Sequence, residues 1–177
     1  MSTQGRVEQG DAWPGAEEVL ESSTADFVAF QEAKVEAEEK QNKEAVATGK
    51  GWKMSINTCL FGDGGGKSAG VAVRCRKHIG MDESFADEEL PEELKGRFTV
   101  KRVGAVCKGG IHLASAYLHS SLGVNHKKNL DMLDAVAAVM STLKGPWVLA
   151  ADFQCTPAQL EATGWLKMVK GRVVAPN

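Results

Sequence analysis

Five side chains that could do acid–base or metal chemistry lie at the ends of apolar segments, at three separate places in the sequence. They are Glu32 after residues 26–30, Tyr117 and His119 at the end of residues 111–118, and Asp152 and Gln154 after residues 147–151. A carboxylate where a buried strand ends is common in the sites of α/β proteins. Tyr117 and His119 are two residues apart, so on a strand they share a face.

The types of these side chains suit a divalent cation beside a phosphate group. Mg²⁺ prefers oxygen ligands and takes one or two carboxylates, with water and substrate phosphate completing its shell. Taken singly, each acid is more often a turn or capping residue than a functional one. We therefore predict that the ends of separate strands bring Glu32 and Asp152 to one shared cation pocket, beside the phenol and the imidazole.

Composition excludes several classes of protein. A chain of 177 residues, 43% of them hydrophobic and 25% charged, is typical of one soluble domain. The net charge of −2 argues against a dedicated polyanion-wrapping protein, although not against a local phosphate site. The longest apolar run, residues 135–140, is far too short to cross a bilayer, so no membrane partner is expected. No signal segment opens the chain, which predicts an intracellular protein; its oligomeric state stays open.

Two common motifs are absent from the sequence. The four cysteines lie far apart without a C-x-x-C pair, so buried thiols are expected at Cys59, Cys75, Cys107 and Cys155. The four histidines lack metal-ligand spacing, which argues against a zinc site: His78, His112, His119 and His126. The glycine run 62–66 is no phosphate loop, because Phe61 stands where the first glycine of that motif must be. A strand follows it where a phosphate loop opens a helix. A hairpin turn is the better interpretation.

The pattern along the chain predicts a layered α/β domain over residues 13–177, after a frayed segment 1–12. Strands are expected at 26–30, 52–61, 69–76, 98–106, 111–118, 147–151 and 169–174, helices at 14–20, 34–48, 125–143 and 156–164, and an acidic loop at 81–93. Asn125 is the expected N-cap of the long helix, and Thr156 with Pro157 and Gln159 fits a capping box. The apolar strands 26–30 and 147–151 are expected to be buried, the second on both faces.

Four segments, taken in order, resemble motifs of the endonuclease/exonuclease/phosphatase superfamily. Its members include apurinic endonucleases, pancreatic-type deoxyribonuclease, inositol-polyphosphate phosphatases and retroelement endonucleases. The segments are FVAFQEAK at 27–34, AGVAVR at 69–74, AYLHS at 116–120 and VLAADFQCTP at 148–157. They resemble the family's "LQE", "GGVAILVR", "NxYxP" or "LHS", and "ilxGDFNxxP" segments. The resemblance spans about residues 13–166.

The resemblance implies a fold, a reaction and a role for each side chain. The fold would be a four-layer α/β sandwich of two packed mixed β-sheets flanked by helices, of which this chain holds a part. The reaction would be attack of activated water on a phosphoester, nucleic acid being one candidate substrate, with Mg²⁺ or alternatively Mn²⁺. Glu32 would hold the metal, Asp152 would orient the water, and Gln154 would touch the phosphate. Either Tyr117 or His119 would face the phosphate, and both alignments stay open.

The sequence also departs from the family pattern. Residues 1–25 hold no asparagine, which the family carries ahead of its "LQE" strand, and the sequence ends at Asn177 before a terminal "SDH" motif. Gln154 replaces the family's asparagine and is longer by one methylene. These departures predict a fragment or a degenerate copy with little turnover, since losing a catalytic base typically costs about 10²–10⁴-fold. A non-catalytic binding module on the same fold, or a generic α/β domain, are the alternatives.

Overall fold

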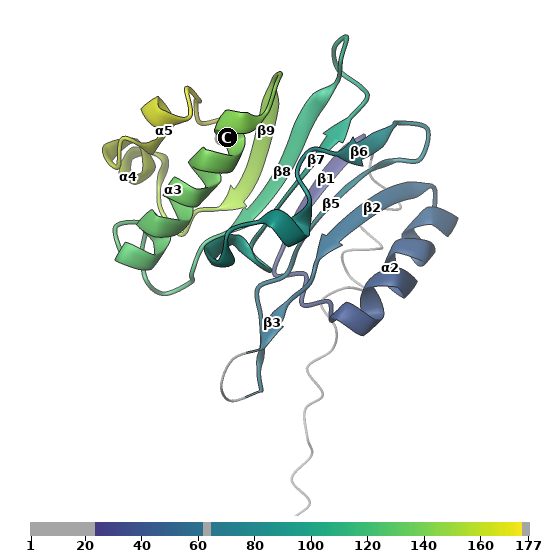
Figure 1. Ribbon diagram of the computed structural model, residues 1–177, viewed down its shortest axis with the longest axis horizontal. Coiled ribbons are helices and arrows are strands. Elements are labelled where there is room, and N and C mark those ends of the chain that lie inside the picture. The colour runs from purple at the N-terminus through teal and green to yellow at the C-terminus, as the bar shows by residue number, and fades with distance from the viewer. Residues whose placement is uncertain (1–23, 62–64, 175–177) are drawn as a thin grey trace, which may run out of the picture.

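Two β-sheets face each other in the computed structural model, which describes residues 24–61 and 65–174 (Figure 1). The first sheet is antiparallel, with the order β1 (Phe27–Gln31), β5 (Val71–Arg76), β2 (Trp52–Asn57). The second is mixed, with the order β6 (Met81–Glu83), β7 (Phe98–Val103), β8 (Ile111–Tyr117), β9 (Trp147–Asp152). In the second sheet β8 and β9 are parallel and the other pairs are antiparallel. The described residues are therefore α/β with a mixed sheet, as the sequence predicts.

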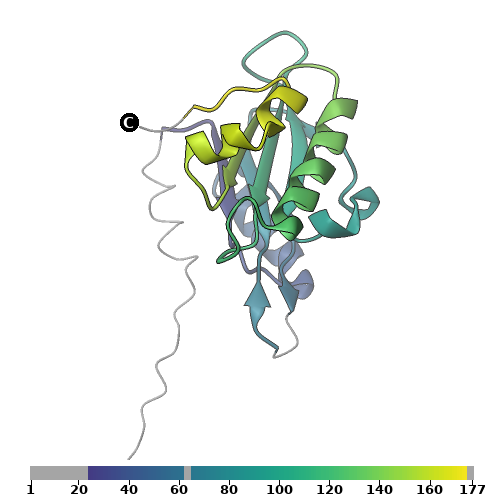
Figure 2. The ribbon, with the colours of Figure 1, turned by 90° about the vertical axis from the view of Figure 1, so that its left-hand side faces the viewer.

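Helices lie on the outer faces of the two sheets. They are α2 (Ala37–Gly49), α3 (Lys127–Thr142), α4 (Pro157–Ala162) and α5 (Trp165–Met168), with 3₁₀ turns η1 (Asp87–Glu89) and η2 (Glu92–Leu94). The helix α2 packs on the first sheet, and Figure 2 views the molecule from the side of α3, α4 and α5, which cover the second. Among the described residues, no helix combines the length and apolar composition that a membrane span requires.

Strand alternation divides the apolar residues of the described chain into four clusters, the smallest of them around Tyr117. Along β5, Val73 and Cys75 point between the sheets, whereas Ala72 points outward to the cluster under α2. In β7, Phe98 and Val100 join the cluster under α3. Successive side chains of a strand point to opposite faces of the sheet, which accounts for this division. It fixes the register of the strands that carry the candidate site.

The long helix α3 and the capping box of α4 follow their sequence patterns. The apolar stripe of α3 lies buried against the second sheet, as predicted from the three- and four-residue spacing. Its N-cap is His126 rather than Asn125, because the His126 imidazole accepts the N–H of Lys128 as an asparagine oxygen would. The predicted capping box at Thr156 and Gln159 is present at the start of α4.

The segments on either side of the glycine run form a hairpin. The short strands β3 (Leu60–Phe61) and β4 (Lys67–Ser68) pair antiparallel on either side of it, and β2 pairs with β5 beyond them. A strand therefore follows the glycines, which confirms the hairpin interpretation. Residues 62–64, the expected helix 14–20 and the segment 1–12 lie outside the described residues.

The expected burial of two strands is wrong. Both β1 and β9 are edge strands of their sheets in the part of the chain that is described, so neither is covered on all sides. All five residues of β1 are half-buried, and the side chain of Val148 in β9 is 51% exposed. An apolar run alone does not reveal whether its strand is central or at an edge.

Three expected elements also differ in the structure. Residues 169–174 form no strand; they follow α5 as irregular chain, with Gly171 against the ring of Trp147. The acidic segment 81–93 is not a simple loop, since it holds β6 and the two 3₁₀ turns. The helix expected from residue 34 begins at Ala37, because Glu32 and Lys34 adopt positive φ angles of 53° and 50°.

All four cysteines are free thiols in different environments. Cys59 and Cys75 are buried, as expected, Cys155 is half-buried, and Cys107 is exposed. Burial raises the pKa of the Cys59 and Cys75 thiols above the ordinary value, which keeps them protonated and inert at neutral pH.

Candidate active site

Glu32 lies in a turn that leaves the end of β1. The turn is held against the chain before β5 by two backbone hydrogen bonds, from Ala33 N–H to Gly70 O (2.8 Å) and from Lys34 N–H to Ala69 O (3.2 Å). Gly70 has a φ of +84°, and a Cβ there would stand 2.8 Å from Lys34 N. Only glycine allows this close approach. Gly70 therefore fixes the position of the turn from which the Glu32 side chain extends.

A polar bridge between the sheets sets the position of Glu32 relative to β8 and β9. The Gln31 amide donates to Ser115 Oγ (2.9 Å) on β8 and to Ala150 O (3.2 Å) on β9. Ser115 Oγ in turn donates to Phe30 O (2.8 Å). These bonds tie the last residues of β1 to both neighbouring strands, one residue before Glu32.

Tyr117, at the end of β8, meets Glu32 directly. Its side chain is buried beside Ala69 and Val71, and its hydroxyl donates a hydrogen bond to Glu32 Oε1. The other carboxylate oxygen of Glu32 lies 4.0 Å from Lys34 Nζ, and the Glu32 side chain is about half exposed. Glu32 thus has one oxygen bonded to the protein and a face open to solvent.

Asp152 ends β9 directly beside Tyr117. The two residues are partners in the parallel register, and Leu118 N–H donates to Asp152 O (3.2 Å). Gln154 holds the Asp152 carboxylate, with its backbone N–H 3.1 Å from Oδ1 and its amide nitrogen 2.6 Å from Oδ2. A φ of 53° turns Gln154 back toward Asp152. Its amide therefore caps the carboxylate instead of extending outward.

The structure thus brings Glu32, Tyr117 and Asp152 to the same end of the two sheets. Burial raises the pKa of the Tyr117 hydroxyl, and the hydrogen bond to Glu32 and the negative charges of Glu32 and Asp152 raise it further. Both carboxylates disfavour the phenolate because they place negative charge next to it. Tyr117 therefore stays a neutral hydrogen-bond donor over the physiological range.

Arg97 is a site residue that sequence reasoning missed. It precedes β7, is 8% exposed, and places its guanidinium 5.7 Å from the centre of the Tyr117 ring. Its side chain also reaches Tyr117 O and Ser68 Oγ, each at 3.4 Å. Burial lowers the pKa of Arg97 below its ordinary value, although a guanidinium remains charged. An arginine before an apolar strand carries no signal of its own in the sequence.

His119 lies near the same cation. Burial lowers the pKa of its imidazole below 6.5, and the positive charge of Arg97 lowers it further, followed by Lys128 and His126. Asn129 fixes the backbone here: its side chain accepts from His119 N–H (2.8 Å) and donates to His119 O (3.1 Å). His119 is therefore a neutral imidazole at pH 7.

The donor set fits a hard cation held by few protein ligands. In the described part of the chain no group of three His, Cys, Asp or Glu side chains is arranged to hold a metal. Mg²⁺ commonly takes one or two carboxylates, with water and phosphate supplying the rest. The half-exposed Glu32 carboxylate suits that mode, and both oxygens of Asp152 already accept hydrogen bonds from Gln154.

Comparison with known proteins shows a similar fold. No protein-family model and no curated protein matches the sequence. The crystal structure of the AP endonuclease LMAP from Leishmania major is similar to this chain, with a TM-score of 0.56 and 14% identity. The match covers 86% of this chain and 60% of that one, so this chain spans about three-fifths of the endonuclease. The α/β arrangement described above is therefore similar to that of an AP endonuclease.

Proposed function

We propose that this chain is a metal-dependent phosphoester hydrolase of the nuclease type, built on the four-layer sandwich of the endonuclease/exonuclease/phosphatase superfamily. One observation carries the proposal: Glu32 and Asp152, 120 residues apart in sequence, both lie next to Tyr117, Glu32 as the acceptor of its hydroxyl and Asp152 as its partner on the neighbouring strand. The likeness of the fold to an AP endonuclease supports it and makes nucleic acid the first substrate to test.

Each side chain has a task that its contacts suit. Glu32, with an open face, would hold Mg²⁺ or Mn²⁺, and such an ion neutralises charge that develops on a phosphate. Asp152, fixed by Gln154, would orient the attacking water through its carboxylate. The Arg97 guanidinium and the neutral imidazole of His119 would contact phosphate oxygens, with Tyr117 as a neutral donor beside them.

An activity assay tests this proposal directly. We expect slow cleavage of a duplex oligonucleotide with one abasic-site analogue, or of bis(p-nitrophenyl) phosphate, dependent on millimolar Mg²⁺. Glu32→Gln should lower the rate by about 10²-fold, because it removes the charged metal ligand. Lys127→Gln, which changes an exposed ion pair at the start of α3, is the matched control and should leave the rate unchanged. Equal rates for wild type and Glu32→Gln would contradict the proposal.

A second candidate is a non-catalytic binding module on the same fold. It is favoured by the contact of Gln154 with both oxygens of Asp152, which occupies the carboxylate that the reaction needs. This candidate predicts no change in Tm with millimolar Mg²⁺. A rise of several degrees that is lost in Asp152→Asn would count against it, because a ligand that binds only the native state stabilises it.

A further inference from the structure

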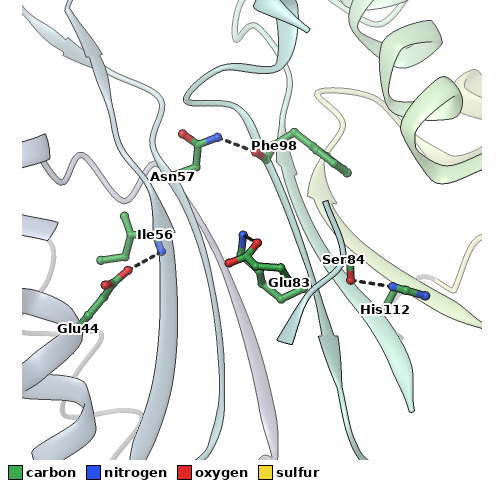
Figure 3. Close-up of polar contacts among 8 residues, drawn as sticks. Glu44, Ile56, Asn57, Glu83, Ser84, Phe98 and His112 are labelled. Atoms are coloured by element: carbon green, nitrogen blue, oxygen red, sulfur yellow. Dashed lines mark hydrogen bonds and ion pairs between the residues drawn. The ribbon is translucent and has the colours of Figure 1, made fainter. Parts of the chain in front are cut away.

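Polar side chains away from the candidate active site bond to other parts of the fold, as two examples show. The Asn57 amide donates to Phe98 O (2.8 Å), which joins β2 to β7, and Ser84 Oγ bonds His112 Nδ1 (2.7 Å) (Figure 3). Such groups create no need for a ligand, because a buried polar group is costly only where it lacks a partner.

The buried cation Arg97 differs from these groups. It is 8% exposed, yet the described residues provide its guanidinium with no carboxylate partner. It contacts two neutral oxygens, Tyr117 O and Ser68 Oγ, each at the long distance of 3.4 Å. A guanidinium has five N–H donors, and a buried charge is costly unless it is paired. An anion beside Arg97 would supply the missing negative charge.

The start of α3 lies beside His119, close to this cation. The Asn129 side chain, in the first turn of α3, accepts from His119 N–H (2.8 Å) and donates to His119 O (3.1 Å). Arg97, Lys128 and His126 all lie near enough for their positive charges to act on the His119 imidazole. His119 is therefore part of a positive region that Arg97 shares with the first turn of α3.

The two lysines that begin α3 differ in how far their charge is neutralised. Lys127 Nζ bonds both carboxylate oxygens of Asp131, at 2.9 and 2.7 Å. Lys128 is exposed and has no ion-pair partner in the part of the chain that the structure describes. The charge of Lys128 is thus available to a ligand, whereas that of Lys127 is already paired.

The N-cap of α3 adds a hydrogen-bond donor at the same place. His126 Nδ1 accepts the N–H of Lys128, so the proton of the neutral ring lies on Nε2, which is free to donate. The first turn of α3 holds no acid, and the positive end of the helix dipole therefore adds to the charge of Lys128.

We propose that Lys128 and His126 bind a second phosphate of the substrate, next to the phosphate at Arg97 and His119, and that the substrate is a polynucleotide. This inference rests on the proposed function, in which Arg97 and His119 contact the reacting phosphate. The neighbouring phosphate of the same strand accepts from Lys128 Nζ and from His126 Nε2–H. A polynucleotide has such regularly spaced phosphates, and their contacts with cations supply much of the affinity for nucleic acid.

Binding of the duplex with one abasic-site analogue, in EDTA so that no metal or cleavage contributes, tests the proposal. Fluorescence anisotropy between about 50 and 200 mM salt gives the affinity and its salt dependence. Lys128→Gln should weaken binding and reduce the slope of log K against log salt by about one, because one phosphate contact is lost. Lys127→Gln is the matched control, since it makes the same substitution at the adjacent, paired lysine, and should keep the wild-type slope.

A second readout compares two substrates with Mg²⁺ present. Lys128→Gln should lower kcat/KM for the duplex but leave hydrolysis of bis(p-nitrophenyl) phosphate unchanged, because that compound has a single phosphate. Wild-type affinity and slope in Lys128→Gln would overturn the proposal, and so would an equal loss of activity toward both substrates. The predicted change in binding, in a chain that hydrolyses neither substrate, would support the second phosphate contact while contradicting the hydrolase function.

Discussion

Tyr117 bonds the Glu32 carboxylate, pairs with Asp152 in the parallel register and is the one tyrosine of the sequence. Its phenolate absorbance therefore reports a single position in the molecule. The neutral hydroxyl that donates to Glu32 links the end of β8 to the turn after β1. A change in the charge of either acid must change the titration of this hydroxyl if the three side chains lie as described.

The first prediction concerns that titration. Glu32→Gln should lower the pKa of Tyr117, because it removes an acceptor that favours the neutral phenol and a charge that opposes the phenolate. Asp152→Asn should lower the pKa by less, since Asp152 acts on Tyr117 through charge alone. Ultraviolet difference spectroscopy during alkaline titration measures both. Glu161→Gln on α4 is the control, and an unchanged Tyr117 pKa in Glu32→Gln would contradict the geometry.

The second prediction concerns His119 and acid. Its pKa is lowered in the folded state by burial and by Arg97, whereas an unfolded chain takes up a proton near pH 6.5. The unfolded state therefore binds more protons as the pH falls, and stability drops through and below that range. His119→Gln should remove this part of the pH dependence. Urea unfolding between pH 7.5 and 5.5 would show it, and parallel curves for the two proteins would argue against a buried neutral imidazole.

At the scale of elements, β1 is connected to the second sheet by the Gln31 side chain. Gln31 touches β8 through Ser115 and β9 through Ala150, so one amide spans the three strands whose ends carry the candidate site. The strand is half-buried at the edge of its sheet and has apolar packing on both sides but no neighbour beyond β5 within the described chain. The bridge is what holds Glu32 toward Tyr117.

The third prediction follows from this bridge. Gln31→Leu keeps the approximate size of the side chain but removes both hydrogen bonds, and should lower the free energy of unfolding by about 1–2 kcal/mol. It should also reduce any Glu32-dependent metal binding, because the turn after β1 loses its tie to β8 and β9. Chemical denaturation with a metal titration checks both effects. Unchanged metal binding in a destabilised variant would show that the bridge is structural alone.

Much of the fold follows from local patterns in the sequence. The apolar stripe of α3, the capping box at Thr156 and the two hairpins depend on residues close together in the chain, and each is present. The burial of β1 and β9 could not be predicted, because it depends on which strands lie beside them. The prediction of a strand at 169–174 is wrong for a related reason. A short apolar run is compatible with a strand or with an irregular segment, and here the segment packs on Trp147.

The residues of the candidate site also differ in whether the sequence indicates them. Glu32 and Asp152 are visible in sequence because each follows an apolar strand, but their common neighbour Tyr117 is set by the order of strands in space. Arg97 and Gln31 carry no local signal, since their partners lie on other elements. The bond of Gln154 to Asp152 depends on the positive φ of Gln154, which its place in the sequence does not reveal.

At the scale of the whole molecule, the two sides of the paired sheets differ. On one side the edge strand β2 is covered by α2, and Glu44 takes the N–H of Ile56, while β6 is short and acidic. Such features block edge-to-edge pairing. On the other side Glu32 directly follows β1 and Asp152 ends β9. The acids thus lie at the same corner of the paired sheets.

Because the chain carries a small net negative charge, phosphate recognition depends on the charges at this corner. With a charge of −2, the molecule has no general attraction for phosphate, so recognition must come from local groups. Lys34 supplies positive charge near Glu32, and Arg97 supplies it beside the Tyr117 ring. A bound divalent cation would supply more, and its binding is the property on which the proposed function depends.

Titration of Mn²⁺ followed by electron paramagnetic resonance tests the convergence of Glu32 and Asp152 most directly, because Mn²⁺ is visible without turnover. We predict one bound ion per wild-type chain, with affinity reduced about tenfold or more in Glu32→Gln and also in Asp152→Asn, since each removes a charge from the site. Glu161→Gln should bind as the wild type does. Wild-type affinity in either of the first two variants, or no bound ion in the wild type, would contradict a shared cation site.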